Sequence, residues 1–255
     1  MQSNEPANEP AREPAREPIF NVPRAVMAVI GVMAALHAGR VYLLNPEENS
    51  QVLLAMAFIP TRYAGFASEI PGGEIAKYTS FVTHMFVHAD AIHLGINSVW
   101  FLAFGSVLCR RMGAARFLLF SMCGGMAGAA AFLIAHPDLA APVIGASGAV
   151  AALMGGVMRF LFSAIDSGRG YLLRDDPASI PRTSLAAALT DRRIVLSSLV
   201  FVVVNLLAIV GFGKAGTVGS IAWEAHLGGY FFGLLAFALF DTALHNSSLY
   251  GGKFE

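Results

Sequence analysis

Six long apolar segments dominate this sequence, and they restrict its possible folds more than any other feature. In chain order they are Arg24–Leu44, Ala91–Leu108, Ala114–Ala135, Val143–Met158, Ile194–Phe212 and Ala222–Phe240. A helix needs about 20 mostly apolar residues to cross a bilayer, and most of the segments approach or reach that length. Hydrophobic residues make up 56% of the 255 positions and charged residues only 13%, which is unlike a soluble protein. The sequence therefore predicts an all-α, multi-pass membrane protein with six transmembrane helices.

The charge balance and the two cysteines exclude other classes. The formal net charge is zero, so binding of nucleic acid has no electrostatic basis. Cys109 and Cys123 lie in or beside apolar segments, where a disulfide framework is not expected.

The basic residues predict the orientation of the segments. With the six spans in place, thirteen lysines and arginines fall on one side of the membrane, and only Arg40, Arg62, Lys77 and Lys214 fall on the other. The positive-inside rule then places both the N- and the C-terminus in the cytoplasm. Residues 1–23 carry proline at every fourth position and are expected to be a disordered cytoplasmic tail rich in Pro and Glu. Residues 24–241 form the expected transmembrane domain, and 242–255 a short cytoplasmic tail.

Two connections between the segments are long. The outer connection Asn45–Asp90 contains an apolar run, Val52–Ile59, which we expect to lie in the membrane interface. The inner connection Ala164–Arg193 is rich in arginine and proline and is expected to be a cytoplasmic linker. The fourth segment, Val143–Met158, is short for a full span, which suggests a helix that starts below the membrane surface.

Four polar side chains share one predicted depth. The second, fourth and sixth segments all enter the membrane from outside, and near these entries lie His93 and Asn97, Ser147, and His226. At about 1.5 Å per residue, each lies roughly 5–10 Å below the start of its helix. Ionisable residues inside a membrane are costly and usually face a partner or a cavity. The four residues are therefore expected to face one cavity.

The chemistry that fits these residues is acyl transfer. Serine needs a base to take its proton, and His226 is the candidate base for Ser147. His93 and Asn97 are four residues apart on one helix face and could stabilise an oxyanion together with the backbone N–H of Ser147. No carboxylate is placed to complete a triad, because Glu224 is expected to point away from His226. The prediction is a Ser–His dyad.

Small residues surround the dyad. Gly145 and Gly148 flank Ser147 and leave room for a close approach of backbone or substrate. Gly229 and Gly233 form a GxxxG face by which the sixth segment can pack against the fourth. Taken alone, the run around Ser147 is also typical of ordinary packing in membrane helices.

These motifs resemble those of the rhomboid family of intramembrane serine proteases. The resemblance is carried by Gly145-Ala146-Ser147-Gly148, His93-x-x-x-Asn97 and Ala225-His226-x-x-Gly229-x-x-x-Gly233, in that register within six segments. It implies a rhomboid-like bundle with Ser147 as nucleophile, His226 as base, and His93 and Asn97 as oxyanion donors. It also implies substrates that are membrane-anchored helices, and it implies no cofactor.

The sequence departs from the family pattern at two places. Thr79 and Ser80 stand where rhomboids commonly carry Trp-Arg, and Ala151 stands where an aromatic ring often stacks on the catalytic imidazole. We therefore expect Ala151 to leave that contact unfilled and another residue to steady the ring of His226.

Parts of the sequence also fit functions other than proteolysis. His84, His88 and His93 suggest a metal site, since His84 and His88 would share a helix face, but a role in hydrogen bonds that stabilise the loop is favoured and no metal is expected. A non-catalytic relative of rhomboid fold that binds transmembrane clients is the main alternative. A transporter is disfavoured because inverted repeats and mid-membrane acidic residues are lacking. The expected location is a bacterial inner membrane.

Overall fold

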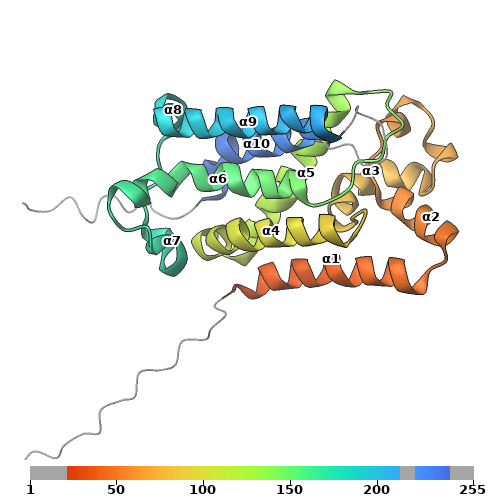
Figure 1. The fold of residues 1–255 in the computed structure, drawn as a ribbon, viewed down its shortest axis with the longest axis horizontal. Coiled ribbons are helices and arrows are strands. Elements are labelled where there is room, and N and C mark those ends of the chain that lie inside the picture. Colours follow the sequence, from red (N-terminus) through yellow and green to blue (C-terminus); the bar gives the residue numbers. More distant parts are fainter. Residues whose placement is uncertain (1–21, 213–221, 242–255) are drawn as a thin grey trace, which may run out of the picture.

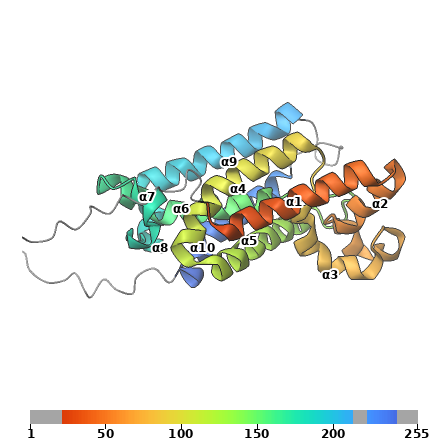
Figure 2. The same cartoon turned by 90° about the horizontal axis from the view of Figure 1, so that it is seen from below.

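Helices form all the regular secondary structure in the residues that the computed structural model describes, 22–212 and 222–241. The long helices are α1 (Arg24–Leu43), α4 (Ala91–Met112), α5 (Ala114–Ala135), α6 (Ser147–Asp166), α9 (Arg192–Phe212) and α10 (Trp223–Phe240). The connections contain α2 (Pro46–Met56), α3 (Gly73–Thr83), α7 (Leu172–Asp175), α8 (Leu185–Thr190) and the 3-10 turns η1 (Pro60–Ala64), η2 (Ala67–Glu69), η3 (His84–Phe86) and η4 (Pro177–Ser179). Figures 1 and 2 show the long helices side by side, with α2 and α3 at one end of the bundle and α7 and α8 at the other.

Within the described residues, five helices are long and apolar enough to cross a membrane: α1, α4, α5, α6 and α10. The prediction of an all-α membrane bundle is thus confirmed for this part of the chain. The remaining predicted span, Ile194–Phe212, coincides with α9, which is not among the five. The number of six spans and the orientation of the termini stay predictions. The expected tails lie outside the described residues, apart from positions 22 and 23.

The boundaries predicted for the fourth segment were wrong. Its helix, α6, begins at Ser147 and ends at Asp166, so it is a full-length helix of 20 residues. The predicted end at Met158 assumed that Arg159 had left the membrane, but this arginine is only 1% exposed and lies inside the helix. Ser147 is the first residue of α6 and therefore lies at the start of its helix, not below it.

Helix α6 packs against α10 at backbone contact. A Cβ atom added at Gly229 would collide with the carbonyl oxygen of Gly148, and one added at Gly233 would collide with that of Ala152. Gly148 in turn approaches the backbone of Gly125 in α5. Because side chains are absent at these contacts, α10 can lie close enough to α6 for residues on the two helices to bond directly.

The apolar run Val52–Ile59 of the outer connection is structured, and its location in the membrane interface stays a prediction. Helix α2 ends at Met56, and the chain continues in extended form, so that Phe58 makes an isolated antiparallel bridge with Val143. The side chain of Phe58 is fully buried against Tyr63 and Phe81. The apolar run is therefore divided between a short helix and a segment buried in the protein.

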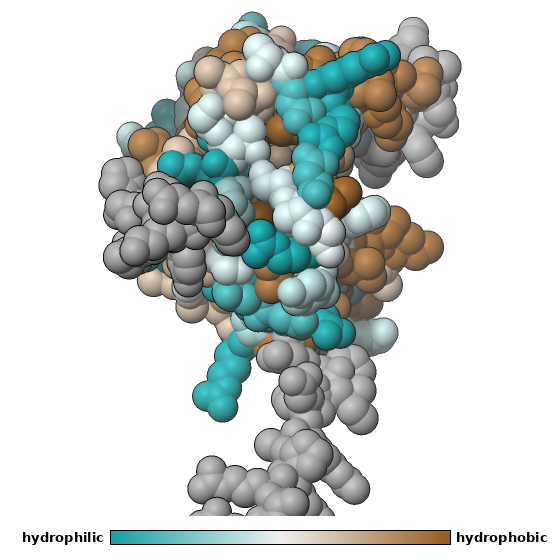
Figure 3. Space-filling model, turned by 90° about the vertical axis from the view of Figure 1, so that its left-hand side faces the viewer, coloured by the Kyte–Doolittle hydropathy of each residue, from teal (hydrophilic) through white to brown (hydrophobic). Residues whose placement is uncertain are grey.

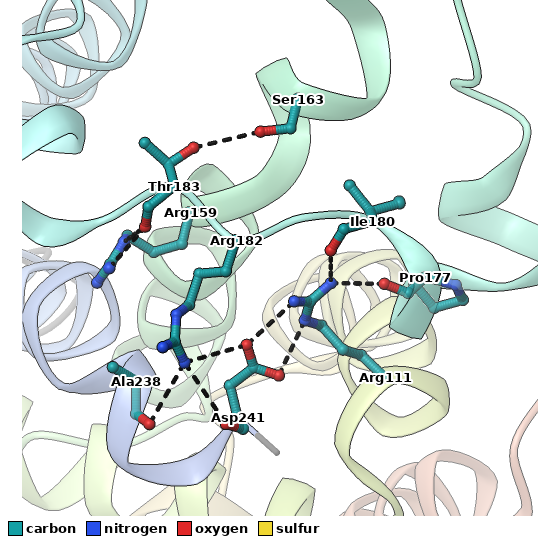
Figure 4. Close-up of polar contacts among 9 residues, drawn as sticks. All are labelled: Arg111, Arg159, Ser163, Pro177, Ile180, Arg182, Thr183, Ala238 and Asp241. Atoms are coloured by element: carbon teal, nitrogen blue, oxygen red, sulfur yellow. Dashed lines mark hydrogen bonds and ion pairs between the residues drawn. The ribbon is translucent and has the colours of Figure 1, made fainter. Parts of the chain in front are cut away.

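The inner connection is packed against the bundle and is not a free linker. Arg111 of α4 makes a two-pronged ion pair with Asp241 at the end of α10, and its Nη1 donates to the carbonyls of Pro177 and Ile180 (Figure 4). Arg159 of α6 donates to the carbonyl of Thr183 in the same connection. Ile180 is only 2% exposed. These contacts attach the connection to α4, α6 and α10, a result that composition alone did not predict.

Figure 3 shows the end of the molecule that carries α7 and α8. Hydrophilic residues gather across this end, whereas hydrophobic residues lie toward its edge. This distribution agrees with a bundle whose sides face lipid and whose end faces water.

Candidate active site

A serine and a histidine from two helices bond to each other inside the bundle. The Oγ of Ser147, the first residue of α6, lies 2.7 Å from Nε2 of His226, in the first turn of α10. Both residues are partly buried. The distance is that of a good hydrogen bond and is short enough for direct proton transfer between the two side chains.

The backbone just before Ser147 is held by the outer connection. The N–H and the carbonyl of Val143 bond to Phe58, and the N–H of Gly145 donates to the carbonyl of His84 at 2.9 Å. Gly145 has a φ of 104°, in the left-handed region where residues with a side chain are strained. The N–H of Ala146 donates to Nε2 of His88 at 3.4 Å. The segment that leads into Ser147 is therefore fixed in a turn that requires glycine.

His93 and Asn97 face this turn from α4. A Cβ atom added at Gly145 would lie 2.6 Å from Nε2 of His93 and 3.5 Å from Nδ2 of Asn97. Asp90 caps α4 by accepting from the N–H of His93 at 2.8 Å, as expected for an Asp just before a helix. The structure thus brings His93, Asn97 and the start of α6 together. Since the first N–H groups of a helix have no partner within it, they can donate at the same place.

His84 and His88 do not share a helix face, so the geometry assumed for a metal pair was wrong. Helix α3 ends at Thr83, and the chain is extended by Val87. Nδ1 of His84 lies 2.8 Å from the carbonyl of Ser80, and His88 bonds to Ala146 as described above. Burial lowers the pKa of His84 to about 4 and that of His88 to about 3, so both rings are neutral at pH 7. The described residues contain no cluster of three or more side chains able to hold a metal ion.

Ala151 does not leave an empty space. It is only 4% exposed and packs in a cluster with Tyr230 and Leu234 of α10. The expectation that no group at this position contacts the ring of His226 stays a prediction. The expectation that another residue steadies the ring of His226 is confirmed, since Nδ1 of that ring lies 2.7 Å from Oδ1 of Asn205 in α9.

Asn205 and His136 are the residues of this region that sequence reasoning missed. Asn205 interrupts the apolar run of its segment, and a polar residue within a predicted span was the signal that could have identified it. His136, at the end of α5, lies 2.5 Å from the carboxylate of Glu224. As expected, Glu224 therefore points away from His226, and it ties α10 to α5.

Apolar helices surround a serine and a histidine that are hydrogen-bonded to each other. The chain is therefore of the class of multi-pass membrane proteins with a polar site between their helices. A family model described as the Rhomboid domain matches residues 76–241, and the chain belongs to the rhomboid family. Part of the chain is also similar to the human Rhomboid-related protein 3, with 40% identity over 79 residues. That match covers 31% of this chain and 19% of the human protein, so this chain covers only a small part of its relative.

Proposed function

We propose that this protein is an intramembrane serine endopeptidase that cleaves membrane-anchored proteins with a Ser147–His226 dyad. The observation that carries the proposal is the 2.7 Å contact between Ser147 Oγ and His226 Nε2. Serine and histidine in this geometry are the parts that nucleophilic acyl transfer needs. Membership of the rhomboid family supports the same assignment.

In the proposed first step, Ser147 Oγ attacks the carbonyl carbon of the scissile peptide bond while His226 Nε2 takes the hydroxyl proton. The negative charge that forms on the carbonyl oxygen is stabilised by the N–H of Ser147 and by the side chains of His93 and Asn97. Their position against Gly145, directly before the nucleophile, supports this role. The carbon–nitrogen bond then breaks, and His226 returns the proton to the leaving amine.

In the second step, water attacks the acyl-enzyme ester while His226 takes a proton from that water. The ester bond breaks, the proton passes to Ser147 Oγ, and a carboxylic acid leaves. All the proton transfers use groups of this chain, and the proposed reaction includes neither a metal nor another cofactor. The partners are transmembrane substrate helices and the surrounding lipid, and nucleic acid is not among them.

The proposal includes the topology. Helices α4, α6 and α10 begin at the same end of the bundle (Figure 1), and their first two turns carry the four polar residues. With six spans and cytoplasmic termini, that end faces outward. A bacterial inner membrane stays a prediction, to be tested by cell fractionation.

The test is labelling of the purified full-length protein with a fluorophosphonate probe, together with cleavage of a single-span reporter protein in liposomes. Ser147→Ala should abolish both, and His226→Ala should depress both strongly. Ser121→Ala is the matched control, because this buried serine of α5 bonds to the carbonyl of Phe117 in its own helix and should leave both unchanged. Cleavage by the Ser147→Ala variant would overturn the mechanism. Loss of cleavage by the parent protein on addition of a chelator would overturn it too. A parent protein that is neither labelled nor active would favour the non-catalytic, client-binding alternative.

A further inference from the structure

Asn205 contacts the candidate base on the side opposite the nucleophile. It lies in α9, among residues that are mostly apolar, and is only 8% exposed. Its Oδ1 is 2.7 Å from Nδ1 of His226, whose Nε2 faces Ser147. Three side chains from three helices therefore form one hydrogen-bonded row, Asn205–His226–Ser147.

The second bond of Asn205 determines which way its amide points. Its Nδ2 donates to the carbonyl of Phe201, one turn earlier in α9, at 2.8 Å. A backbone carbonyl can only accept, so the amide nitrogen must face Phe201 and the amide oxygen must face His226. With the amide reversed, two acceptors would face each other at Phe201.

The orientation of this amide determines the tautomer of His226. An oxygen acceptor at Nδ1 requires the proton of the neutral imidazole to be on Nδ1. Nε2 is then left with its lone pair directed at the hydroxyl of Ser147. This tautomer can accept the serine proton, whereas the other tautomer would direct an N–H at the hydroxyl.

Neighbouring contacts keep Asn205 in place. Phe201, which accepts from the amide, also stacks on Tyr230 of α10, with ring centroids 4.5 Å apart. The hydroxyl of Tyr230 lies 2.8 Å from Oγ of Ser198 in α9. Tyr230 is one turn beyond His226, so α9 and α10 are joined at two successive levels.

We propose that Asn205 is a positioning residue that selects the active tautomer of His226 and holds its ring, so that the working unit is Ser147–His226–Asn205. The catalytic part of this inference rests on the proposed function. The amide of Asn205 on α9 thus holds the ring of His226, which an aromatic ring at position 151 would otherwise do.

The test compares variants of the full-length protein in liposomes. Asn205→Leu keeps a similar volume but removes the acceptor, and should lower the maximal rate of fluorophosphonate labelling on the order of 10²-fold or more while leaving the affinity for the probe unchanged. Asn205→Asp restores an acceptor for His226 but loses the donor to Phe201. Its maximal labelling rate should be at least about tenfold higher than that of Asn205→Leu. Val204→Ala, at an adjacent position that is 59% exposed, is the control and should label at the parent rate.

A second measurement does not depend on activity, and its result for the parent protein does not depend on the folding of any Asn205 variant. In protein carrying ¹⁵N-labelled histidine, the imidazole signals of His226 are those lost in His226→Ala. In the parent they should show the proton on Nδ1, and in Asn205→Leu they should show a mixture of tautomers or the proton on Nε2.

The inference is overturned if parent His226 carries its proton on Nε2, or if a folded Asn205→Leu variant labels at the parent rate. An unlabelled parent protein in which His226 is protonated on Nδ1 would refute the proposed function while retaining the role of Asn205 in orienting the ring.

Discussion

The contact between Gly229 and Gly148 gives a direct test of how helix packing supports the site. In Gly229→Ala, the new Cβ would collide with the carbonyl oxygen of Gly148, a backbone atom that no rotamer change can move. Helices α6 and α10 must then separate. Forced overpacking of this kind costs typically 1–3 kcal/mol of unfolding free energy. The same separation acts on the bond between Ser147 and His226, since Ser147 is adjacent to Gly148 and His226 lies about one helical turn before Gly229.

A separation of about 1 Å would lengthen the 2.7 Å contact beyond the range of a hydrogen bond. We therefore expect Gly229→Ala to lose at least about tenfold in probe labelling, equivalent to about 1.4 kcal/mol, in addition to its loss of stability. The assays are the labelling rate and the unfolding midpoint in mixed micelles. Gly31→Ala is the matched control, because a Cβ there meets nothing within 4 Å and replacing a helical glycine by alanine should be neutral or stabilising. Equal labelling rates and equal unfolding midpoints for Gly229→Ala and Gly31→Ala would refute the packing argument.

Three further predictions use other parts of the molecule. Asn97→Ala should lower kcat by about 10²–10³ and still be labelled by the probe, and a parent-like rate would remove Asn97 from the oxyanion site. Arg111→Met leaves the buried carboxylate of Asp241 with Arg182 as its remaining partner and should cost about 3 kcal/mol in unfolding free energy measured in micelles, the low end for a broken buried pair, whereas a loss under 1 kcal/mol would show the Arg111 pair to be dispensable. Reporter fusions after Arg111 and Ser167 should report cytoplasm and a fusion after Asp138 the outside, and reversal at two of these points would reject the topology.

The helix positions were predictable where apolar patterning ended at a clear boundary. The predicted segment Ala114–Ala135 has the same bounds as α5, because Gly113, with a φ of 81°, separates it from α4. The prediction failed at α6, because a charged residue was taken as the end of the span. Arg159 satisfies its charge inside the protein, by donating to the carbonyls of Leu234 and Thr183. Such long-range partners are not visible in a local pattern.

The sequence predicted which residues come together in the candidate site. It did not predict which contacts hold them in place. His93, Asn97, Ser147 and His226 were identified as polar residues near the same end of three apolar segments, and the fold brings them together. Asn205 was missed because its segment was treated as uniformly apolar. Its importance depends on a partner 21 positions away in the sequence, on another helix, which only the packing of α9 against α10 defines.

The outer connection explains how the proposed nucleophile, Ser147, can keep its position at the first residue of a helix. Residues there usually fray, because their N–H groups have no partner within the helix. In this chain the preceding turn is bonded to Phe58, His84 and His88, all from one connection, before α6 begins. Both histidines are held neutral by burial, and His88 can accept from Ala146 only in that state. The connection therefore holds the backbone that carries Ser147 through the residues just before α6.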